Sequence, residues 1–329
     1  MKVEALDATG IENLGVRTRV RIAARAELTP RVITLDLESA TGEPLRPASP
    51  GAHVALHLPS GLVRQYSLCT PAPDLYRIAV LRVDDGRGGS REVHQLPAGL
   101  ELDITGPRNS FPLVTAERHL LVGGGIGITP LAAMAHDLQT KGEPFRVVLA
   151  IRSIDDAPLL QLLPLGCDVE VHVSSDGDRL DLAGLLSGVA PGTAVYACGP
   201  RSMLAEAASW SFALQRAGAS LQLEHFEASE DTVAAQHSDS DRPFRVTFAR
   251  SGDHVTIEPG TTILAAARRA GKVVESSCEE GYCGTCETRI LSGTPDHRDD
   301  FLTPEERDSN ETMMICVSRC SGGELVLDL

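Results

Sequence analysis

Short runs of alternating apolar and polar residues, separated by turns rich in Pro and Gly, make up the N-terminal part of the chain. The clearest runs are 19–24, 32–37, 53–58, 76–83 and 100–105. Alternation at period two predicts strands with one buried face. Because no long helical pattern separates these runs, we expect a small antiparallel β-barrel.

The pattern changes at Arg118, where strand-like runs begin to alternate with helical ones. Strands are predicted at 119–122, 145–151, 169–173, 194–197 and 222–226, and helices near 130–140 and 201–216. This alternation is typical of an α/β domain with a parallel sheet.

A polar, turn-rich segment at 228–242 follows and predicts a linker. Beyond it, the pattern predicts a hairpin at 244–250 and 254–257, a helix at 263–270, and strands at 288–291 and 324–327. The expected organisation is multidomain. It comprises an antiparallel β-barrel domain at 15–114, an α/β parallel-sheet domain at 115–227, the linker, and a small α+β domain at 243–329, called here the C-terminal domain.

Length, charge and cysteine usage narrow the functional class. The 329 residues predict two or three domains. A formal net charge of −15 disfavours nucleic acid or an anionic membrane as partners. The N-terminus lacks the apolar core of a signal peptide, and no apolar run approaches the ~18 residues of a membrane span. Four of the eight cysteines are scattered without pattern, so we expect a reducing, cytoplasmic location.

The most informative motif is a set of four cysteines in the C-terminal domain. Cys278, Cys283 and Cys286 are followed, after 29 intervening residues, by Cys316. This is the ligand spacing of a plant-type [2Fe-2S] cluster. A four-cysteine zinc site is the alternative, but such sites more often use two closely spaced cysteine pairs. Iron and sulfide are therefore the favoured interpretation, and one-electron chemistry follows from it.

Two segments of the barrel suggest a flavin site. Arg64, Tyr66 and Ser67 bring a cation, an aromatic ring and a hydroxyl together in the segment 64–68, which is predicted to end a strand, with Arg64 and Tyr66 on one face. The cation can bind a phosphate and the ring can cover an isoalloxazine. Segment 86–90, Gly-Arg-Gly-Gly-Ser, precedes a predicted short helix and can present N–H groups to an anion. An ordinary edge strand and a plain hairpin loop are the alternatives.

Two turns of the α/β domain suggest a nucleotide site. Segment 123–130, Gly-Gly-Gly-Ile-Gly-Ile-Thr-Pro, joins a strand to a helix and lets the backbone approach a pyrophosphate. It departs from the GxGxxG fingerprint, because Thr-Pro replaces the third glycine. A second turn, formed by Cys198, Gly199 and Pro200, joins the predicted strand 194–197 to the helix that follows it. This puts Cys198 at the carboxyl edge of the sheet, where ligands bind. The alternatives are a structural turn and a buried small thiol.

With these sites in this order, the sequence resembles the phthalate dioxygenase reductase family, which includes vanillate demethylase reductase components. The resemblance extends from about residue 17 to the C-terminus. It depends on the motifs above, on His225-Phe226-Glu227 and on the closing segment 316–329. It implies an FMN barrel domain, an NADH domain and a β-grasp ferredoxin domain. Electrons would pass from NADH through FMN and the [2Fe-2S] cluster to a partner oxygenase, and the resemblance implies one of the Rieske mono- or dioxygenase or demethylase class.

The resemblance also implies roles for individual residues. Flavin contacts would come from Arg64, Tyr66, Ser67, Ala79, Leu81 and Phe226, with Gly89 and Ser90 as the FMN phosphate loop. Family members often have a basic residue where Leu81 stands. FMN is favoured over FAD by the resemblance alone. Gly125, Gly127 and Thr129 would hold the pyrophosphate, and Cys198, with Gly199 and Pro200, would lie near the nicotinamide, which makes Cys198 and Thr129 the catalytic candidates.

The choice of coenzyme and acceptor is less constrained. Asp176 follows a strand where the adenine ribose is expected, and its carboxylate would bind ribose hydroxyls and repel a 2′-phosphate. Arg152 and Arg179 would favour NADPH if they lie close to that ribose, but NADH is the favoured coenzyme.

The C-terminal domain has nine Lys and Arg against fifteen Asp and Glu, a net charge of −6, which suggests docking on a basic patch of the acceptor. The alternative functions are the same relay serving a cytochrome P450 or other acceptor, and a non-enzymatic redox sensor.

Overall fold

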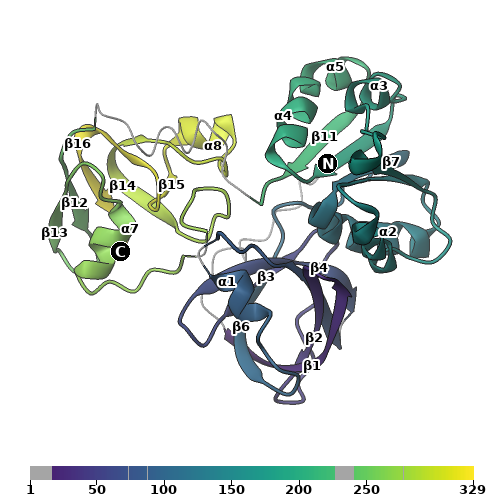
Figure 1. The fold of residues 1–329 in the computed structure, drawn as a ribbon. Coiled ribbons are helices and arrows are strands. Elements are labelled where there is room, and N and C mark those ends of the chain that lie inside the picture. Colours follow the sequence, from purple (N-terminus) through teal and green to yellow (C-terminus); the bar gives the residue numbers. More distant parts are fainter. Residues whose placement is uncertain (1–16, 73, 87, 227–240, 277) are drawn as a thin grey trace, which may run out of the picture. The chain divides into compact units, whose positions relative to one another are not determined.

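The computed structural model describes residues 17–72, 74–86, 88–226, 241–276 and 278–329 (Figure 1). The chain forms two compact units, Met1–Glu224 and His225–Leu329. Apart from 241–242, the predicted linker at 228–242 lies outside the described residues. No helix among the described residues is long and apolar enough to cross a membrane.

Six antiparallel strands close into a barrel in the order β1-β2-β5-β4-β3-β6, which confirms the predicted fold of this part (Figure 1). The strands are β1 (Arg17–Thr29), β2 (Val32–Ser39), β3 (His53–His57), β4 (Val63–Ala72), β5 (Leu75–Leu81) and β6 (Glu101–Arg108). Helix α1 (Gly89–Val93) connects β5 to β6. Alternate residues such as Val54, Leu56 and Leu68 fill the barrel core together with Val93 of α1. Burial of one face thus explains the period of two.

One expectation for the barrel is corrected. The segment from Arg64 to Leu68 was expected to end a strand, but β4 continues beyond it to Ala72. The pairing of β4 with β5 shifts between Leu68 and Thr70, so a bulge at Cys69 lets the strand continue past the segment. The continuation places Ser67 in the interior of the strand.

A five-stranded parallel sheet in the order β11-β10-β7-β8-β9 follows the barrel, as predicted. Its strands are β7 (Arg118–Gly124), β8 (Phe145–Ile151), β9 (Val169–Val173), β10 (Thr193–Cys198) and β11 (Ser220–Glu224). The connections hold η2 (Gly125–Gly127), α2 (Ile128–Lys141), η3 (Ile154–Leu162), η4 (Ser174–Asp176), α3 (Leu182–Ser187), α4 (Arg201–Ser209) and α5 (Ser211–Arg216). The helix predicted at 201–216 is therefore two helices, which meet at Trp210.

The barrel and the parallel sheet share one hydrophobic core and belong to the same compact unit. Val32, Cys69 and Ala79 of the barrel lie in one buried cluster with Leu131 and Met134 of α2. The segment that joins the two parts is fixed as well, because the Val114 amide donates a hydrogen bond to the Tyr196 hydroxyl of β10 at 2.6 Å. The flavin and nucleotide turns predicted from the sequence are therefore held by a continuous core.

The second unit contains a five-stranded mixed sheet in the order β13-β12-β16-β14-β15. Its elements are β12 (Phe244–Phe248), β13 (His254–Ile257), α7 (Ile263–Arg269), β14 (Glu287–Asp296), α8 (Pro304–Ser309), β15 (Thr312–Met314) and β16 (Arg319–Leu327). Strands β12 and β16 are parallel, and the other pairs are antiparallel. Phe248, Ile263 and Met313 belong to a separate buried core. This confirms the predicted α+β domain.

Candidate functional site

The four cysteines of the sequence motif lie together in the C-terminal domain. The thiols of Cys283 and Cys316 donate hydrogen bonds to the sulfur of Cys278, and Cys316 also contacts Cys286. Cys278, Cys286 and Cys316 are each only 3% exposed, whereas Cys283 is half-buried. None of the four forms a disulfide. A loop between α7 and β14 thus supplies three sulfurs, and the turn between β15 and β16 supplies the fourth.

The loop that carries these sulfurs turns backbone amides toward them. The Glu280 amide donates to Cys278 Sγ at 3.3 Å, and the Cys278 amide donates to Cys283 Sγ at 3.4 Å. Gly284 has a φ of 72°, and a Cβ atom there would meet the Phe301 ring at 2.4 Å. Glycine is therefore required at this position by both backbone angle and space.

These contacts shift the proton affinity of the thiols. Hydrogen bonds from Cys283 and Cys316, together with the Glu280 and Tyr282 amides, hold the pKa of Cys278 far below that of a free thiol. The pKa values of Cys283 and Cys316 are raised because each thiol donates its hydrogen to Cys278. Four converging sulfurs with amide donors fit an iron-sulfur cluster, whose bridging atoms need such donors. In the described part of the chain, no three His, Cys, Asp or Glu side chains are arranged for a single metal ion.

A buried ionic network supports the segment beneath the cysteine loop. Arg298 binds Asp241 with two nitrogens, at 2.7 and 3.3 Å, and these side chains are 11% and 4% exposed. The neighbouring Asp299 carboxylate accepts a hydrogen bond from the Leu302 amide at 2.8 Å. The Asp300 amide donates to the Gly281 carbonyl of the loop at 2.9 Å. A backbone hydrogen bond therefore ties the loop to the segment that carries this ionic network.

The structure brings the two predicted flavin-phosphate segments together. A Cβ atom on Gly89 would meet Arg64 Nε at 2.5 Å, so the guanidinium group lies directly against the first residue of α1. The Ser90 hydroxyl accepts a hydrogen bond from the Val83 amide at 3.0 Å and orders the turn. A cation beside helical N–H groups is an arrangement that binds phosphate.

The other predicted flavin residues lie on both faces of the barrel wall. Tyr66 packs against the barrel core, and its burial raises the pKa of its hydroxyl. Ser67 is 6% exposed and follows Tyr66 on the opposite face of β4. Ala79 is buried on β5, and Leu81 ends that strand. Phe226 belongs to the second compact unit, and its flavin contact stays a prediction.

The two predicted nucleotide turns pack backbone to backbone. A Cβ atom on Gly127 would meet the Cys198 carbonyl oxygen at 2.2 Å, and one on Gly124 would meet Pro200 Cδ at 2.4 Å. Gly199 is similarly crowded, with Met203 Cε at 2.5 Å from its Cβ position. Gly125 differs, because its φ of 53° demands glycine while the space beside it is open. The open side of the turn is where an anion can approach the backbone.

The structure also places the remaining nucleotide candidates. The Thr129 hydroxyl donates to the Ile126 carbonyl at 3.0 Å and is buried, so it closes the turn before α2. Cys198 is fully buried, which raises the pKa of its thiol well above the ordinary value and keeps it protonated. Asp176 lies exposed at the end of η4, where it accepts a hydrogen bond from the Ser175 hydroxyl at 2.9 Å.

Sequence reasoning missed Glu224, the last residue of β11. It pairs directly with Cys198 of β10, so the two residues lie side by side at the carboxyl edge of the sheet. Burial raises the pKa of Glu224 to about 8, which keeps the carboxyl group largely protonated at neutral pH. The sequence shows that Glu224, like Cys198, lies near the end of a predicted strand. Only the register of β10 and β11 shows that the two residues are neighbours.

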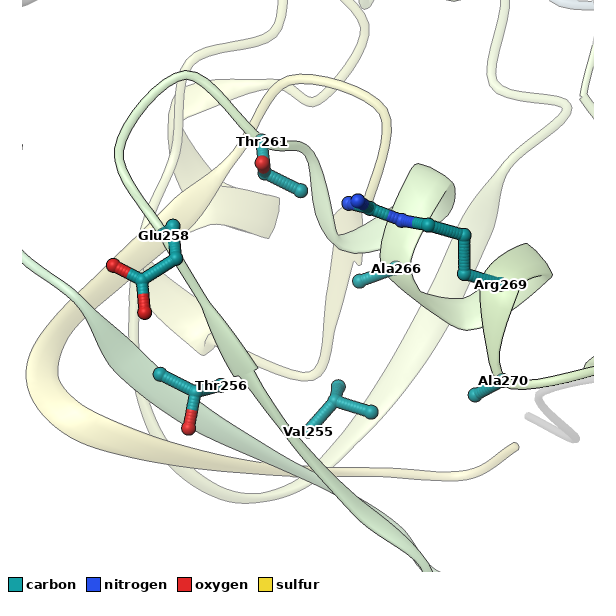
Figure 2. A pocket seen from close by; sticks show the side chains of 7 residues that line it. All are labelled: Val255, Thr256, Glu258, Thr261, Ala266, Arg269 and Ala270. Atoms are coloured by element: carbon teal, nitrogen blue, oxygen red, sulfur yellow. The ribbon is translucent and has the colours of Figure 1, made fainter.

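Two surface cavities lie away from these residues. One, of about 290 Å³, opens between β13 and α7 of the C-terminal domain, with Val255, Ala266 and Ala270 on its floor (Figure 2). Glu258 and Arg269 lie on its opposite sides (Figure 2). The other, of about 280 Å³, is next to α1 in the barrel and is lined by Arg25, Glu27, Thr29, Pro30, Ile33, Arg82, Arg91, His94 and Gln95. Neither contains a predicted site residue.

Comparison with known proteins assigns a family to this arrangement. Residues 246–321 match the 2Fe-2S iron-sulfur cluster binding domain. Vanillate O-demethylase oxidoreductase of Pseudomonas sp. (strain HR199 / DSM 7063) is 38% identical, over 94% of this chain and 99% of its own length.

Solved structures agree with this assignment. Phthalate dioxygenase reductase superposes with a TM-score of 0.69 and 32% identity, over 95% of this chain and 98% of its own. A type IV self-sufficient cytochrome P450 monooxygenase superposes with a TM-score of 0.81 and 33% identity; all of this chain corresponds to 43% of that longer one. With its barrel, parallel sheet and four-cysteine domain in the same order, this chain belongs to the phthalate dioxygenase reductase family.

Proposed function

We propose that this protein is an NADH-dependent reductase that passes electrons through FMN and a [2Fe-2S] cluster to a separate oxygenase of the Rieske type. The observation that carries the proposal is the contact among four cysteine sulfurs in a chain that also holds two glycine turns of the nucleotide-binding kind. The relatives named above support it, since phthalate dioxygenase reductase is described as transferring electrons from pyridine nucleotides to [2Fe-2S].

Each part of the chain has a separate task in this proposal. The barrel, 15–114, binds FMN; the parallel-sheet domain, 115–227, binds NADH; and the C-terminal domain, 243–329, holds the cluster. Flavin supplies the conversion between two-electron and one-electron chemistry. The residues of this chain bind and orient the coenzymes and exclude water, and no acid or base is needed for hydride transfer itself. We place the protein in the cytoplasm, because the cysteines it needs as ligands must stay reduced.

Individual residues take the following roles. Arg64 and the Gly89 turn bind the FMN phosphate, while Tyr66 and Ser67 contact the flavin ring. The turn at Gly125 and Gly127 binds the pyrophosphate of NADH. Cys198 and Glu224 border the nicotinamide as uncharged groups, an environment that favours a neutral reduced ring over the cationic oxidised one. Asp176 selects NADH by repelling a 2′-phosphate.

A cytochrome P450 is the second candidate acceptor. The observation that favours it is the superposition with the self-sufficient P450 monooxygenase, in which a chain segment of this architecture makes up 43% of a longer protein. Electron transfer rates to a purified Rieske oxygenase and to a P450 would distinguish the two acceptors.

The proposal is tested by removing one cluster ligand. In C283S, we expect NADH to reduce the flavin within about twofold of the wild-type rate, because Cys283 lies in the C-terminal domain. Reduction of a one-electron protein acceptor such as cytochrome c should fall at least 100-fold. Stopped-flow absorbance follows the flavin, and iron and sulfide analysis follows the cluster.

A matched control is C320S, since Cys320 is half-buried in the same domain and is outside the sulfur contacts. It should keep the cluster and the activity. Zinc or no metal in the wild-type protein, or loss of flavin reduction in C283S, would contradict the proposal. Chromatography of the released flavin distinguishes FMN from FAD.

A further inference from the structure

His172, in the edge strand β9 of the parallel sheet, binds two carboxylates at once. Its Nδ1 atom lies 2.9 Å from Asp178 Oδ1, and its Nε2 atom lies 2.9 Å from Glu170 Oε1. An ionised carboxylate can only accept a hydrogen bond, so both ring nitrogens must donate, and the ring is an imidazolium cation. The imidazole is 16% exposed, whereas the carboxylates of Glu170 and Asp178 are 41% and 58% exposed. The two carboxylates therefore shield the cation from water.

The bond between His172 and Asp178 closes a loop around Asp176. Asp176 is the last residue of η4, which follows β9 directly. Before it, the Ser175 amide donates to the Arg152 carbonyl at 2.9 Å, which ties the loop to the end of β8. Beyond it, Asp178 is tied back to β9 through the imidazole. Asp176, the residue predicted to bind the adenine ribose, therefore lies between two fixed points.

This loop lies at the same edge of the sheet as the glycine turn at 125–127. Strands β7, β8 and β9 are consecutive and parallel. The glycine turn follows β7 and η4 follows β9, so both are at the carboxyl edge, two strands apart. That is the edge at which a parallel sheet binds a dinucleotide.

The neighbours of His172 favour the protonated ring. Its pKa is raised, chiefly by the hydrogen bond to Asp178, with further contributions from the charges of Asp178 and Glu170, while burial opposes the shift. Strand β8 places the uncharged Ala150 opposite His172, and Arg146 of the same strand binds Glu170. Both hydrogen bonds are therefore present below the raised pKa, and one is lost when the ring gives up a proton.

We propose that His172 is a positioning residue for coenzyme choice, which holds Asp178 and thereby keeps Asp176 where its carboxylate binds the ribose hydroxyls of NADH and repels the 2′-phosphate of NADPH. The inference rests on the proposed function, because it takes Asp176 as the residue that selects NADH. A loop that is fixed on both sides of Asp176 does not have to be ordered when the coenzyme binds.

The test is the ratio of kcat/KM for NADH to kcat/KM for NADPH in variants of His172. H172Q removes the charge and one of the two donors, so the ratio should fall about fivefold, the value of one partly exposed charged hydrogen bond. H172R keeps a cation that can donate to both carboxylates, and its ratio should stay within about twofold of wild type. H136Q is the matched control, because His136 of α2 lies in the same domain but bonds the Leu162 carbonyl. It should leave the ratio unchanged.

The pH dependence of this ratio separates positioning from a purely structural role. In the wild type, the ratio should fall between pH 7 and pH 9 as His172 loses its proton, whereas H172R should show no such fall because arginine stays protonated. The 2′-phosphate titrates near pH ~6, below this range. Burial raises the pKa of Glu224 to about 8, but this residue borders the nicotinamide that both coenzymes share, so its titration cancels in the ratio.

A measurement without coenzyme tests the contact itself. NMR titration of the His172 ring should give a pKa above 6.5 in the wild type and a lower pKa in D178A, which lacks the main cause of the shift. D178A should also lower the coenzyme ratio as H172Q does, and the double variant H172Q/D178A should lower it no further.

Several outcomes would overturn the inference. These are a wild-type ratio in H172Q, equal losses with both coenzymes, a greater loss with NADPH than with NADH, or a wild-type His172 pKa at or below 6.5. If H172Q does not fold, D178A and H172R decide the question by the same ratio. A wild-type protein that oxidises neither coenzyme would instead overturn the proposed function, and the NMR titration would still show whether His172 holds Asp178.

Discussion

The contact between the two nucleotide turns gives a quantitative test of the site. In G127A, the new Cβ atom would lie 2.2 Å from the Cys198 carbonyl oxygen and 2.7 Å from the Gly199 nitrogen. Carbon and oxygen atoms need roughly 3.2 to 3.5 Å, so one turn must move by about 1 Å. The obstacle is backbone of a fully buried strand end, which puts the cost near the upper end of the ~1–3 kcal/mol typical of overpacking.

One opposing effect reduces this cost. Gly127 has a φ of −62°, a value that alanine adopts without strain. The higher helix propensity of alanine can therefore offset up to about 1 kcal/mol of the destabilisation at this position. The net expectation is a loss of about 2 kcal/mol, or about 4–8 °C in the melting temperature of a unit of this size. Displacement of the turn should also raise the KM for NADH about tenfold.

Thermal unfolding and stopped-flow flavin reduction measure these effects. The control is G188A at the end of α3, where φ is −92° and the nearest atoms lie 3.8 Å from the Cβ position. It should change neither quantity appreciably, and the visible spectrum of the cluster should be the same in both variants. If G127A matches G188A in stability and in KM, the turns do not hold each other in the way the structure indicates.

The remaining predictions concern the C-terminal domain, pH and the coenzyme. R298M should destabilise the C-terminal domain by about 2 kcal/mol in urea unfolding, because Asp241 stays buried and keeps, among the described residues, only Arg319 as an ion-pair partner, whereas the exposed-pair control R250M should cost under about 1 kcal/mol. Because His53 of β3 is buried, its pKa is about 4 in the folded state and 6.5 ordinarily, so the unfolded chain binds this proton more tightly. The free energy of unfolding should therefore be highest above pH 6.5 and should fall by about 3 kcal/mol as the pH falls toward 4. Melting curves of H53L should lack this pH dependence. D176S should raise kcat/KM for NADPH relative to NADH about tenfold, and a wild-type preference for NADPH would refute the role of Asp176.

The sequence pattern predicted the bounds of several strands well. Strands β8, β9 and β13 begin and end at the predicted residues, because each is bounded by turn residues and either alternates or, in β8, is apolar apart from Arg146. The short helices α3 and α8 were not predicted. Helix α3 depends on the Asp181 side chain, which accepts a hydrogen bond from the Gly184 amide, and α8 depends on a capping box at Thr303. Such helices are stabilised by caps and packing more than by periodicity.

The candidate sites also include features that the sequence predicts and features that it does not. The cysteine spacing could be recognised because three of the four sulfurs come from one loop, so most of the cluster ligands lie close together in the sequence. The pairing of Glu224 with Cys198 and the place of His53 beside Ser67 could not be predicted. Each depends on which strands are neighbours and on their register, neither of which the apolar pattern of one strand determines.

The shared core of barrel and parallel sheet limits how this reductase can change. Val32 and Ala79 on one side and Leu131 on the other belong to a single packed cluster, so a substitution that suits one coenzyme is felt where the other binds. The C-terminal domain has its own core around Phe248 and Ile263. Its surface is therefore free to diverge toward new electron acceptors while the coenzyme-binding half of the chain stays fixed.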